Sequence, residues 1–340
     1  MNMSCVIGQE KAMSTITKAI KDGRKHHAWI FCGPRGVGKF TAAVEFASKI
    51  IGGVKFGLEH PDIHIICKED VVWSQNPSLQ RRKQTNIPVD LLRERIVGGK
   101  TSDDKTHESA VFKTPVLASN KVFIIDEAEL LDEQGQNSLL KTLEEPPLDT
   151  TIILVTSRDD LLLPTIQSRC TSVSFSPLSD DEMRMWSENI NLDVSPSDLS
   201  WAIQFSGGSP GLVFEAIETN LSGLARSISD FLGREKTDNY SYVSTLLVDF
   251  VESTVSKKLK QNSFASKEQE NRRAVELLLC LFSASSQNFL RSEMVSEGVS
   301  SSFVISDIEG LLSTNISMKV LVESLCARWV NLSAGDTIFV

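Results

Sequence analysis

The stretch Ala28-Trp29-Ile30-Phe31-Cys32 is followed by Gly33-Pro34-Arg35-Gly36-Val37-Gly38-Lys39-Phe40 and then by TAAVEFASKI (Thr41–Ile50). The first part is a short apolar run, which predicts a buried strand, and the last part is rich in helix formers without proline or glycine. The middle part fits a phosphate-binding loop at every position but the last, where the pattern requires Ser or Thr. A strand, a glycine-rich loop and a helix in this order predict a nucleotide-binding α/β domain.

The expected task of this loop, including Thr41 after it, is to bind a nucleotide. Its glycines let backbone N–H groups point at a phosphate, and Lys39 is expected to reach the β- and γ-phosphates. Phe40 lacks the hydroxyl that would hold Mg²⁺. The Thr41 hydroxyl is a poor substitute, because successive side chains of a helix point about 100° apart. We expect ATP to bind weakly, with Mg²⁺ only alongside the nucleotide, and to be hydrolysed slowly or not at all.

Further apolar runs predict the other strands of a parallel sheet with helices on both faces. They are Ile63–Cys67, Val122–Ile125, Thr151–Val155 and Val173–Phe175. Helices are predicted over 9–22, 89–96 and 137–145. The polar segments 68–88 and 98–107 are expected to be surface loops. The basic run Arg81-Arg82-Lys83 is interpreted as a solvated surface in preference to a nucleic-acid contact.

After Pro177 the sequence predicts only helices and loops. Short helices are expected over 180–188, 198–205 and 211–218, the last with Ser209 as N-cap and Pro210 at the first helical position. Longer helical periodicity includes 246–251, 274–282 and 320–330, with Ser296–Ser302 as a connection. We expect an α/β domain over 1–176, a small helical domain over 177–220 and a larger helical domain over 221–340.

Composition limits the function classes. The 340 residues carry a formal net charge of -9, so the chain is not expected to be a general DNA binder, which needs a basic surface. Six cysteines are present without a CxxC pair, which argues against zinc and fits a reducing compartment. An apolar signal core and an apolar run of about 18 residues are both missing from the sequence, so a soluble cytoplasmic protein without membrane contact is expected.

Polar residues end two of the predicted strands. Asp126 and Glu127 follow Val122–Ile125, and ligands of open α/β sheets bind at the carboxyl ends of the strands. Asp126 would orient the metal or its water shell, Glu127 would polarise an attacking water, and Thr156 would sense the γ-phosphate. The alternatives are an acidic N-cap that starts the next turn and a strand-end threonine without a role.

Ser168-Arg169-Cys170 follows the short apolar segment Leu161–Ile166. Taken alone, Arg169 is most simply a surface arginine. The alternative is an arginine finger that supplies positive charge to the nucleotide of a neighbouring subunit.

Seven segments carry a resemblance to a known family and cover roughly residues 6–215. They are VIGQ (Val6–Gln9), HAWIFCGPRGVGK (His27–Lys39), HPDI (His60–Ile63), VFIIDEAELL (Val122–Leu131), NSLLKTLEEPP (Asn137–Pro147), LPTIQSRC (Leu163–Cys170) and GGSPG (Gly207–Gly211). In this order they resemble the bacterial clamp-loader subunits of the AAA+ family, most closely those of the delta-prime type of DNA polymerase III.

The resemblance implies an ATPase-type domain, a helical lid and a helical collar that joins delta and gamma/tau subunits in a ring. Such rings open a sliding clamp and place it on primed DNA as part of the DNA polymerase (nucleotidyltransferase) holoenzyme. It implies that Arg169 is the finger and that the chain is a stator without ATP turnover of its own. Gly211 stands where active members have a lid arginine. The zinc-module cysteines that the family has before the His60-Pro61-Asp62 segment are absent, and Cys67 lies on the other side of that segment.

Two alternatives to the stator stay open. One is a catalytically active clamp-loader ATPase of the gamma/tau type, which Asp126, Glu127 and Arg169 allow. The other is an AAA+ protein outside replication, such as a recombination-related helicase loader.

Overall fold

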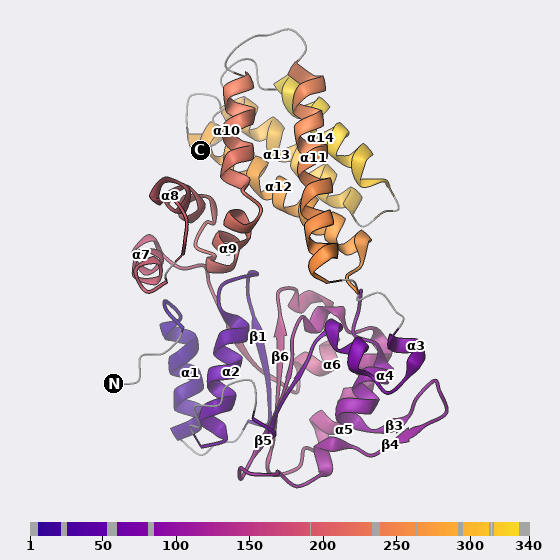
Figure 1. The fold of residues 1–340 in the computed structure, drawn as a ribbon. Helices are drawn as coiled ribbons and strands as arrows, with labels where there is room; N and C mark the ends of the chain where they lie inside the picture. The colour runs from indigo at the N-terminus through magenta and orange to yellow at the C-terminus, as the bar shows by residue number, and fades with distance from the viewer. Residues whose placement is uncertain are drawn as a thin grey trace. The chain divides into compact units, whose positions relative to one another are not determined.

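The computed structural model describes residues 6–21, 26–52, 60–80, 85–190, 192–232, 239–262, 264–291, 295–312, 314 and 316–332 (Figure 1). The basic run Arg81–Lys83 lies outside the described residues. The chain forms two compact units: residues 1–192 with 207–211, and residues 193–206 with 212–340. The three-domain division stays a prediction.

A five-stranded parallel sheet forms the centre of the first unit. Its strands are β1 (Ala28–Cys32), β2 (Ile63–Ile66), β5 (Lys121–Ile125), β6 (Thr150–Thr156) and β7 (Thr171–Ser174). Their order is β2-β5-β6-β1-β7, and each neighbouring pair runs parallel. Every residue of β1 and β5 is buried, as expected for strands that are covered on both faces. The predicted α/β sheet is confirmed, with each strand within two residues of its expected bounds.

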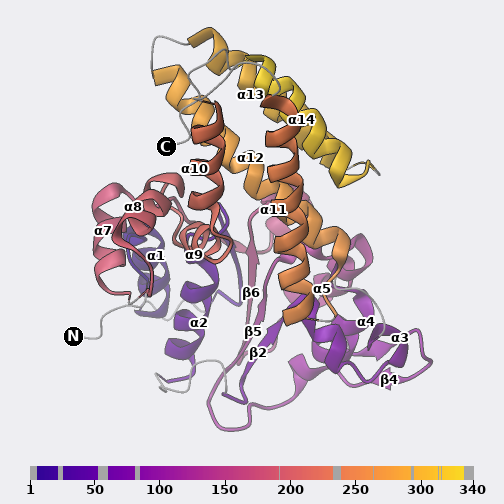
Figure 2. The same cartoon turned by 45° about the horizontal axis from the view of Figure 1, so that its top comes forward.

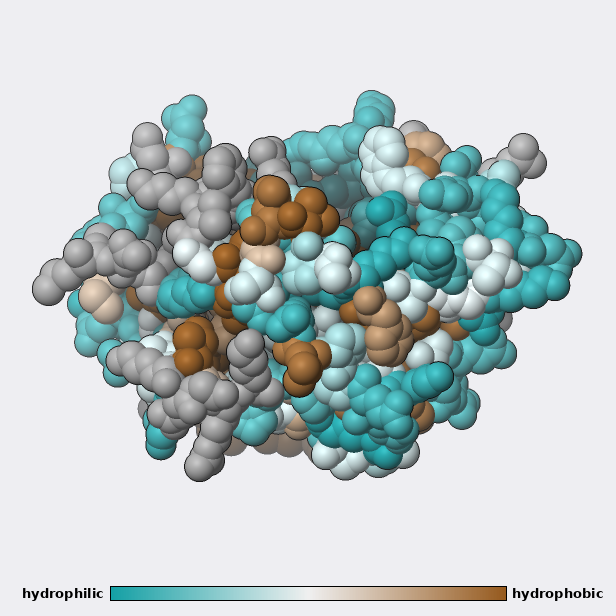
Figure 3. Space-filling model, turned by 90° about the horizontal axis from the view of Figure 1, so that it is seen from below, coloured by the Kyte–Doolittle hydropathy of each residue, from teal (hydrophilic) through white to brown (hydrophobic). Residues whose placement is uncertain are grey.

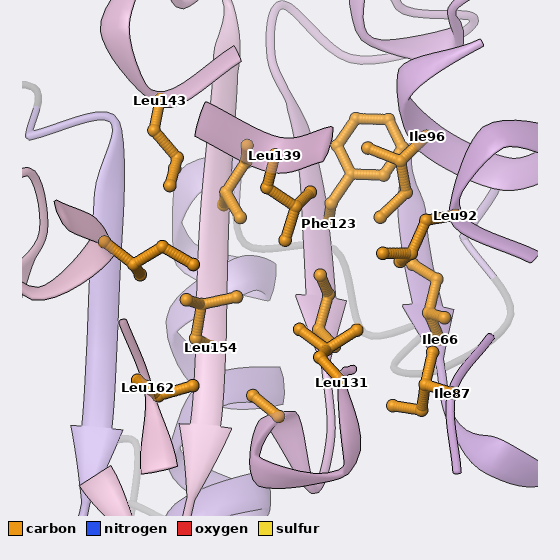
Figure 4. Close-up of a cluster of buried hydrophobic side chains, with 14 of the residues drawn as sticks. Ile66, Ile87, Leu92, Ile96, Phe123, Leu131, Leu139, Leu143, Leu154 and Leu162 are labelled. Atoms are coloured by element: carbon orange, nitrogen blue, oxygen red, sulfur yellow. The ribbon is translucent and has the colours of Figure 1, made fainter. Parts of the chain in front are cut away.

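Helices cover both faces of this sheet (Figure 1). One side has α1 (Glu10–Lys21) and α2 (Lys39–Ile50), and the other has α4 (Val89–Leu92) with its continuation η3 (Arg93–Val97), α5 (Glu133–Glu144) and α6 (Pro164–Gln167). Successive side chains of a strand point to opposite faces. Trp29 and Phe31 therefore join the core under α1 and α2, while Phe123 and Leu154 join Leu139 of α5 in the core on the other side (Figure 4).

Two segments predicted as loops contain short elements. Residues 68–88 include η2 (Lys68–Trp73) and α3 (Pro77–Gln80), and residues 98–107 include the hairpin strands β3 (Gly99–Lys100) and β4 (Thr106–His107). Side-chain hydrogen bonds stabilise the starts of η2 and α3. Asp70 Oδ2 accepts from Cys67 N at 2.9 Å, and Asn76 Oδ1 accepts from Ser78 N at 2.9 Å. Elements of two to six residues are too short to show a hydrophobic period, so the prediction missed them.

The elements that the structure describes in the second unit are all helices. It contains α8 (Pro196–Phe205), most of α9 (Pro210–Glu218), α10 (Leu221–Leu232), α11 (Asn239–Gln261), α12 (Lys267–Arg291), α13 (Val295–Leu312) and α14 (Met318–Leu332), while α7 (Asp180–Glu188) belongs to the first unit. Helices α13 and α14 lie side by side (Figure 2). Phe282 of α12 and Trp329 of α14 meet edge to face in the core, with ring centroids 4.7 Å apart.

The predicted connection Ser296–Ser302 is wrong, because these residues lie inside α13. The small side chains serve a close helix contact. A Cβ on Gly298 would lie 2.8 Å from Leu290 Cγ of α12, and the Ser301 and Ser286 hydroxyls are 2.8 Å apart. Glycine and serine at this place mark the approach of two helices, which a single sequence does not distinguish from a linker.

Several large hydrophobic side chains are exposed in the first unit. Leu148, Leu117 and Val116 are 91%, 75% and 71% exposed, and they precede β6 and β5. On the face shown in Figure 3, the coloured hydrophobic residues form separate patches among hydrophilic ones. Exposed apolar residues that are scattered among hydrophilic ones are ordinary for a protein surface.

Candidate nucleotide site and candidate arginine finger

The loop between β1 and α2 has the backbone shape of a phosphate-binding loop. Gly33, Gly36 and Gly38 have φ values of 144°, 78° and 98°, which side chains rarely allow, and a Cβ on Gly33 would lie 2.2 Å from Phe175 O. Gly38 is the N-cap of α2, so the first N–H groups of that helix lie directly after the glycines of the loop. Such N–H groups and the helix dipole favour an anion. The predicted strand–loop–helix arrangement is confirmed, and its ligand stays a prediction.

Lys39 turns back onto its own loop. The residue is 6% exposed. Its Nζ donates to Gly33 O at 2.7 Å, Pro34 O at 2.6 Å and Ser157 Oγ at 3.1 Å. Burial lowers the pKa of Lys39, and the nearby Glu129 carboxylate opposes that shift. The ammonium group is thus held where a phosphate-binding lysine is needed, with carbonyl oxygens as its present partners.

Phe40 packs its ring against the hydrophobic core that includes Trp29 and Phe31. The position that should carry a metal-binding hydroxyl therefore carries an aromatic side chain that is partly buried among apolar groups. Thr41 is exposed on the next position of α2. The structure does not support the Thr41 hydroxyl as a substitute for the one missing at position 40.

Asp126 directly follows β5 at the carboxyl edge of the sheet. Burial raises its pKa to about 6, and the Glu127 and Glu129 carboxylates add to the rise, while the N–H of Glu127 lowers it. That N–H donates to Asp126 Oδ1 at 3.0 Å. Asp126 therefore lies where a metal-orienting carboxylate is expected, in surroundings that disfavour its negative charge unless a cation is near.

Glu127 is paired with two cations. Its Oε2 is 2.7 Å from Lys68 Nζ, and its Oε1 is 3.6 Å from Arg35 Nη1. The residue has φ of 49° and is the N-cap of the short helix η5 (Ala128–Leu130), although its side chain makes no capping bond. The predicted water-polarising carboxylate is thus engaged at both oxygens. Lys68 was missed by the sequence reasoning, and its only signal is its place just after a predicted strand.

Thr156 is the last residue of the neighbouring strand β6, and Ser157 follows it. Thr156 pairs with Cys32 in the sheet, is 1% exposed, and accepts from Arg158 N at 3.0 Å through Oγ1. Ser157, which the sequence reasoning missed, binds Lys39 through its hydroxyl and donates its N–H to Glu129 Oε1 at 3.2 Å. The structure therefore brings Lys39, the acidic strand end and the end of β6 together at one edge.

Arg169 lies at the opposite edge. Thr171 of β7 pairs with Trp29 of β1, so Arg169 precedes the amino end of β7, while the phosphate loop follows the carboxyl end of β1. Strand β1 has five residues, which span about 16 Å at about 3.3 Å per residue. The guanidinium is 2.5 Å from Glu144 Oε1 and donates to Thr165 O at 2.9 Å. Arg169 is thus the one predicted site residue that the structure keeps apart from the others.

The segment before and at the start of α9 contacts the phosphate loop. Gly211 N donates to Gly36 O at 2.9 Å, and Ser209 Oγ donates to Arg35 O at 2.9 Å. The predicted N-cap Ser209 therefore directs its hydroxyl to the loop. Among the described residues, no three His, Cys, Asp or Glu side chains are placed to share a metal ion, and none of the described helices is long and apolar enough to cross a membrane.

Comparison with known proteins places the chain. Residues 8–179 match the family described as "DNA polymerase III, delta subunit". The chain is 30% identical to the DNA polymerase III subunit gamma/tau of Mycobacterium tuberculosis over 224 residues, which are 65% of this chain and 37% of the relative. It is 31% identical to the DNA polymerase III subunit tau of Bacillus subtilis over 180 residues, which are 51% and 29% of the two chains.

The chain thus spans well under half the length of these curated relatives. A solved structure of a DNA polymerase III, gamma subunit-related protein from Thermotoga maritima is similar in fold, with a TM-score of 0.53 and 18% identity over 93% of this chain and 98% of that one. The family match covers half of the chain and includes the phosphate loop, the acidic strand end and Arg169. The chain therefore belongs to the family described as DNA polymerase III, delta subunit.

Proposed function

We propose that the chain is a delta-prime-type stator of the DNA polymerase III clamp loader. It would join delta and gamma/tau subunits in a ring that places the sliding clamp on primed DNA. The family match and the likeness to gamma/tau subunits support a place in this complex. The observation that supports the stator role is the loop between β1 and α2, which has the glycines and Lys39 of a phosphate-binding loop but Phe40 where the pattern requires Ser or Thr.

Two features of that site oppose hydrolysis. Phe40 supplies no oxygen for Mg²⁺, and loss of metal stabilisation costs several kcal/mol in the transition state, or about tenfold in rate for each 1.4 kcal/mol. Glu127 Oε2 is 2.7 Å from Lys68 Nζ, so the lysine competes with a water for this carboxylate and lowers its strength as a base. ATP, with Mg²⁺ alongside it, would bind weakly through the loop and Lys39 and turn over slowly or not at all.

Arg169 is the residue through which the chain would contribute to catalysis. It is separated from its own phosphate loop by the length of strand β1, which is about 16 Å. Its side chain is 34% exposed, and its pairing with Glu144, which is 49% exposed, is of the surface kind that contributes at most about 1 kcal/mol. The guanidinium is therefore available at little cost to the ATP site of a neighbouring subunit.

The test is the DNA-stimulated ATPase activity of the reconstituted complex. Arg169→Ala should leave assembly intact and lower turnover at the adjoining site by about 10³-fold, the scale of an arginine finger. Arg169→Lys should also fail, because an ammonium cannot replace the planar guanidinium. Arg184→Ala is the matched control, since Arg184 is a surface arginine of α7 paired with Asp181 at 3.4 Å. Unchanged ATPase activity in Arg169→Ala would rule out the finger.

The alternative is an active ATPase subunit of the gamma/tau type, which the similarity of about 30% to such subunits favours. The isolated chain with ATP and Mg²⁺ separates the two. Turnover that Lys39→Ala abolishes would support the alternative, and absence of turnover would support the stator.

A further inference from the structure

Two backbone segments of the first unit approach each other where both carry glycine. A Cβ on Gly211 would lie 2.6 Å from Gly36 Cα, and a Cβ on Gly36 would lie 2.4 Å from Ser209 Oγ and 3.0 Å from Gly211 Cα. Real Cβ atoms do not come within 2.6 Å of backbone, so the approach requires glycine at 211. Gly36 has a φ of 78°, which side chains rarely adopt, and its Cβ would also meet the Ser209 hydroxyl. The hydrogen bond from Gly211 N to Gly36 O, 2.9 Å long, joins the two segments at this point.

Helix α9 begins in this contact. Pro210, its first residue, has no N–H, so Gly211 carries the first free N–H of the helix. That group normally needs a capping side chain or water, and here the phosphate loop accepts it. Ser209 adds a second bond to Arg35 O at 2.9 Å. The loop carbonyls thus complete the start of α9, and the start of α9 in turn fixes the loop.

The segment 207–211 is itself held from the other side. Leu178 N donates to Gly208 O at 2.8 Å, and Gly208 has φ of 89°, where a Cβ would lie 2.2 Å from Leu178 O. Leu178 follows β7, the strand beside β1. The segment is therefore anchored to the chain after β7 and bonded to the loop after β1.

We propose that residues 207–211 form a latch that holds the phosphate loop and the start of α9 together without nucleotide. A ligand shifts a conformational equilibrium only by its different affinity for the two states. Because the latch already orders the loop, and Lys39 already bonds to loop carbonyls, a nucleotide has little left to order. The inference rests on the proposed stator function and adds that the first turn of α9 does not respond to ATP.

Hydrogen exchange of the full chain, followed by mass spectrometry, tests the latch. Peptides that cover 33–41 and 207–218 are compared in the wild type, Gly211→Ala, Ser209→Ala and Gly310→Ala. Gly310 is the matched control, because it lies in a helix and a Cβ there would meet nothing within 4 Å. In Gly211→Ala the added Cβ must part the two segments, so both peptides should exchange about tenfold faster. Ser209→Ala, which loses one hydrogen bond, should have a smaller effect on the same peptides.

Over 207–218 the wild type should exchange equally with and without ATP and Mg²⁺. Exchange over 33–41 that is the same in Gly211→Ala, Ser209→Ala and Gly310→Ala would overturn the latch. Slower exchange over 207–218 of the wild type on addition of ATP would overturn it as well. These measurements need neither the complex nor Arg169, so their failure is distinct from failure of the finger.

Discussion

Asp126→Asn should stabilise the folded chain at neutral pH. Burial raises the pKa of Asp126 from 3.8 to about 6, so the folded state holds this proton more tightly than the unfolded state. The stabilisation from the protonated carboxyl is present below about pH 4 and is lost as the pH rises through about 6. Each tenfold difference in proton affinity is worth about 1.4 kcal/mol, so a pKa that rises from 3.8 to about 6 corresponds to about 3 kcal/mol. Asparagine cannot ionise and keeps an oxygen for Glu127 N.

Urea unfolding at pH 4 and pH 8 measures this difference. The two proteins should be nearly equal at pH 4, and Asp126→Asn should be more stable by up to about 3 kcal/mol at pH 8. Asp249→Asn, at an exposed position of α11, is the control and should not change the pH dependence. A wild type that is as stable as Asp126→Asn at pH 8 would refute the view that this carboxylate is held in the folded site at a cost.

Three further predictions concern the fold. Gly298→Ala should lower the free energy of unfolding by about 1–3 kcal/mol, because the new methyl would meet Leu290 Cγ at 2.8 Å, whereas Gly310→Ala, measured in the same urea series, should not destabilise. Asp62→Ala should cost about 2–4 kcal/mol at pH 7, because the Asp62 carboxylate accepts three backbone N–H groups of residues 116–118 at 2.5–2.8 Å. Burial raises the pKa of Asp62, but these N–H groups hold it below 3.8, so the difference should be present at neutral pH and shrink as the pH falls below about 4. Arg169→Ala should change the thermal midpoint of the isolated chain by no more than the equivalent of about 1 kcal/mol, and a larger loss would mean that Arg169 has a structural role.

The strands of the sheet were predictable because parallel strands buried on both faces read as short apolar runs. Their order was not, since apolar runs do not say which strands are neighbours. Helix starts were predicted well where a cap stood beside a clear period, as at Pro210. They were missed where the cap was hidden: α5 begins at Glu133 because Asp132 Oδ1 accepts from Gly135 N at 2.6 Å.

The site was predictable in the parts that follow strands. Lys39, Asp126 and Thr156 meet at the carboxyl edge because parallel strands end there. Lys68, Glu129 and Ser157 were missed, because their importance comes from which side chains they reach and not from their spacing. The contact of Gly36 with Gly211 was also invisible in the sequence, where the second glycine read only as the loss of an arginine.

The placement of Arg169 and of the phosphate loop at opposite edges of one sheet has a consequence for how such a chain can change over time. A residue change in the loop, for example at Phe40, acts on one edge and is separated by the buried strand β1 from the packing around Arg169. Loss of chemistry at one edge is then compatible with continued selection at the other. Under the proposed stator role, ATP turnover can be lost at one edge of the sheet while the arginine at the other edge stays essential to the neighbouring subunit.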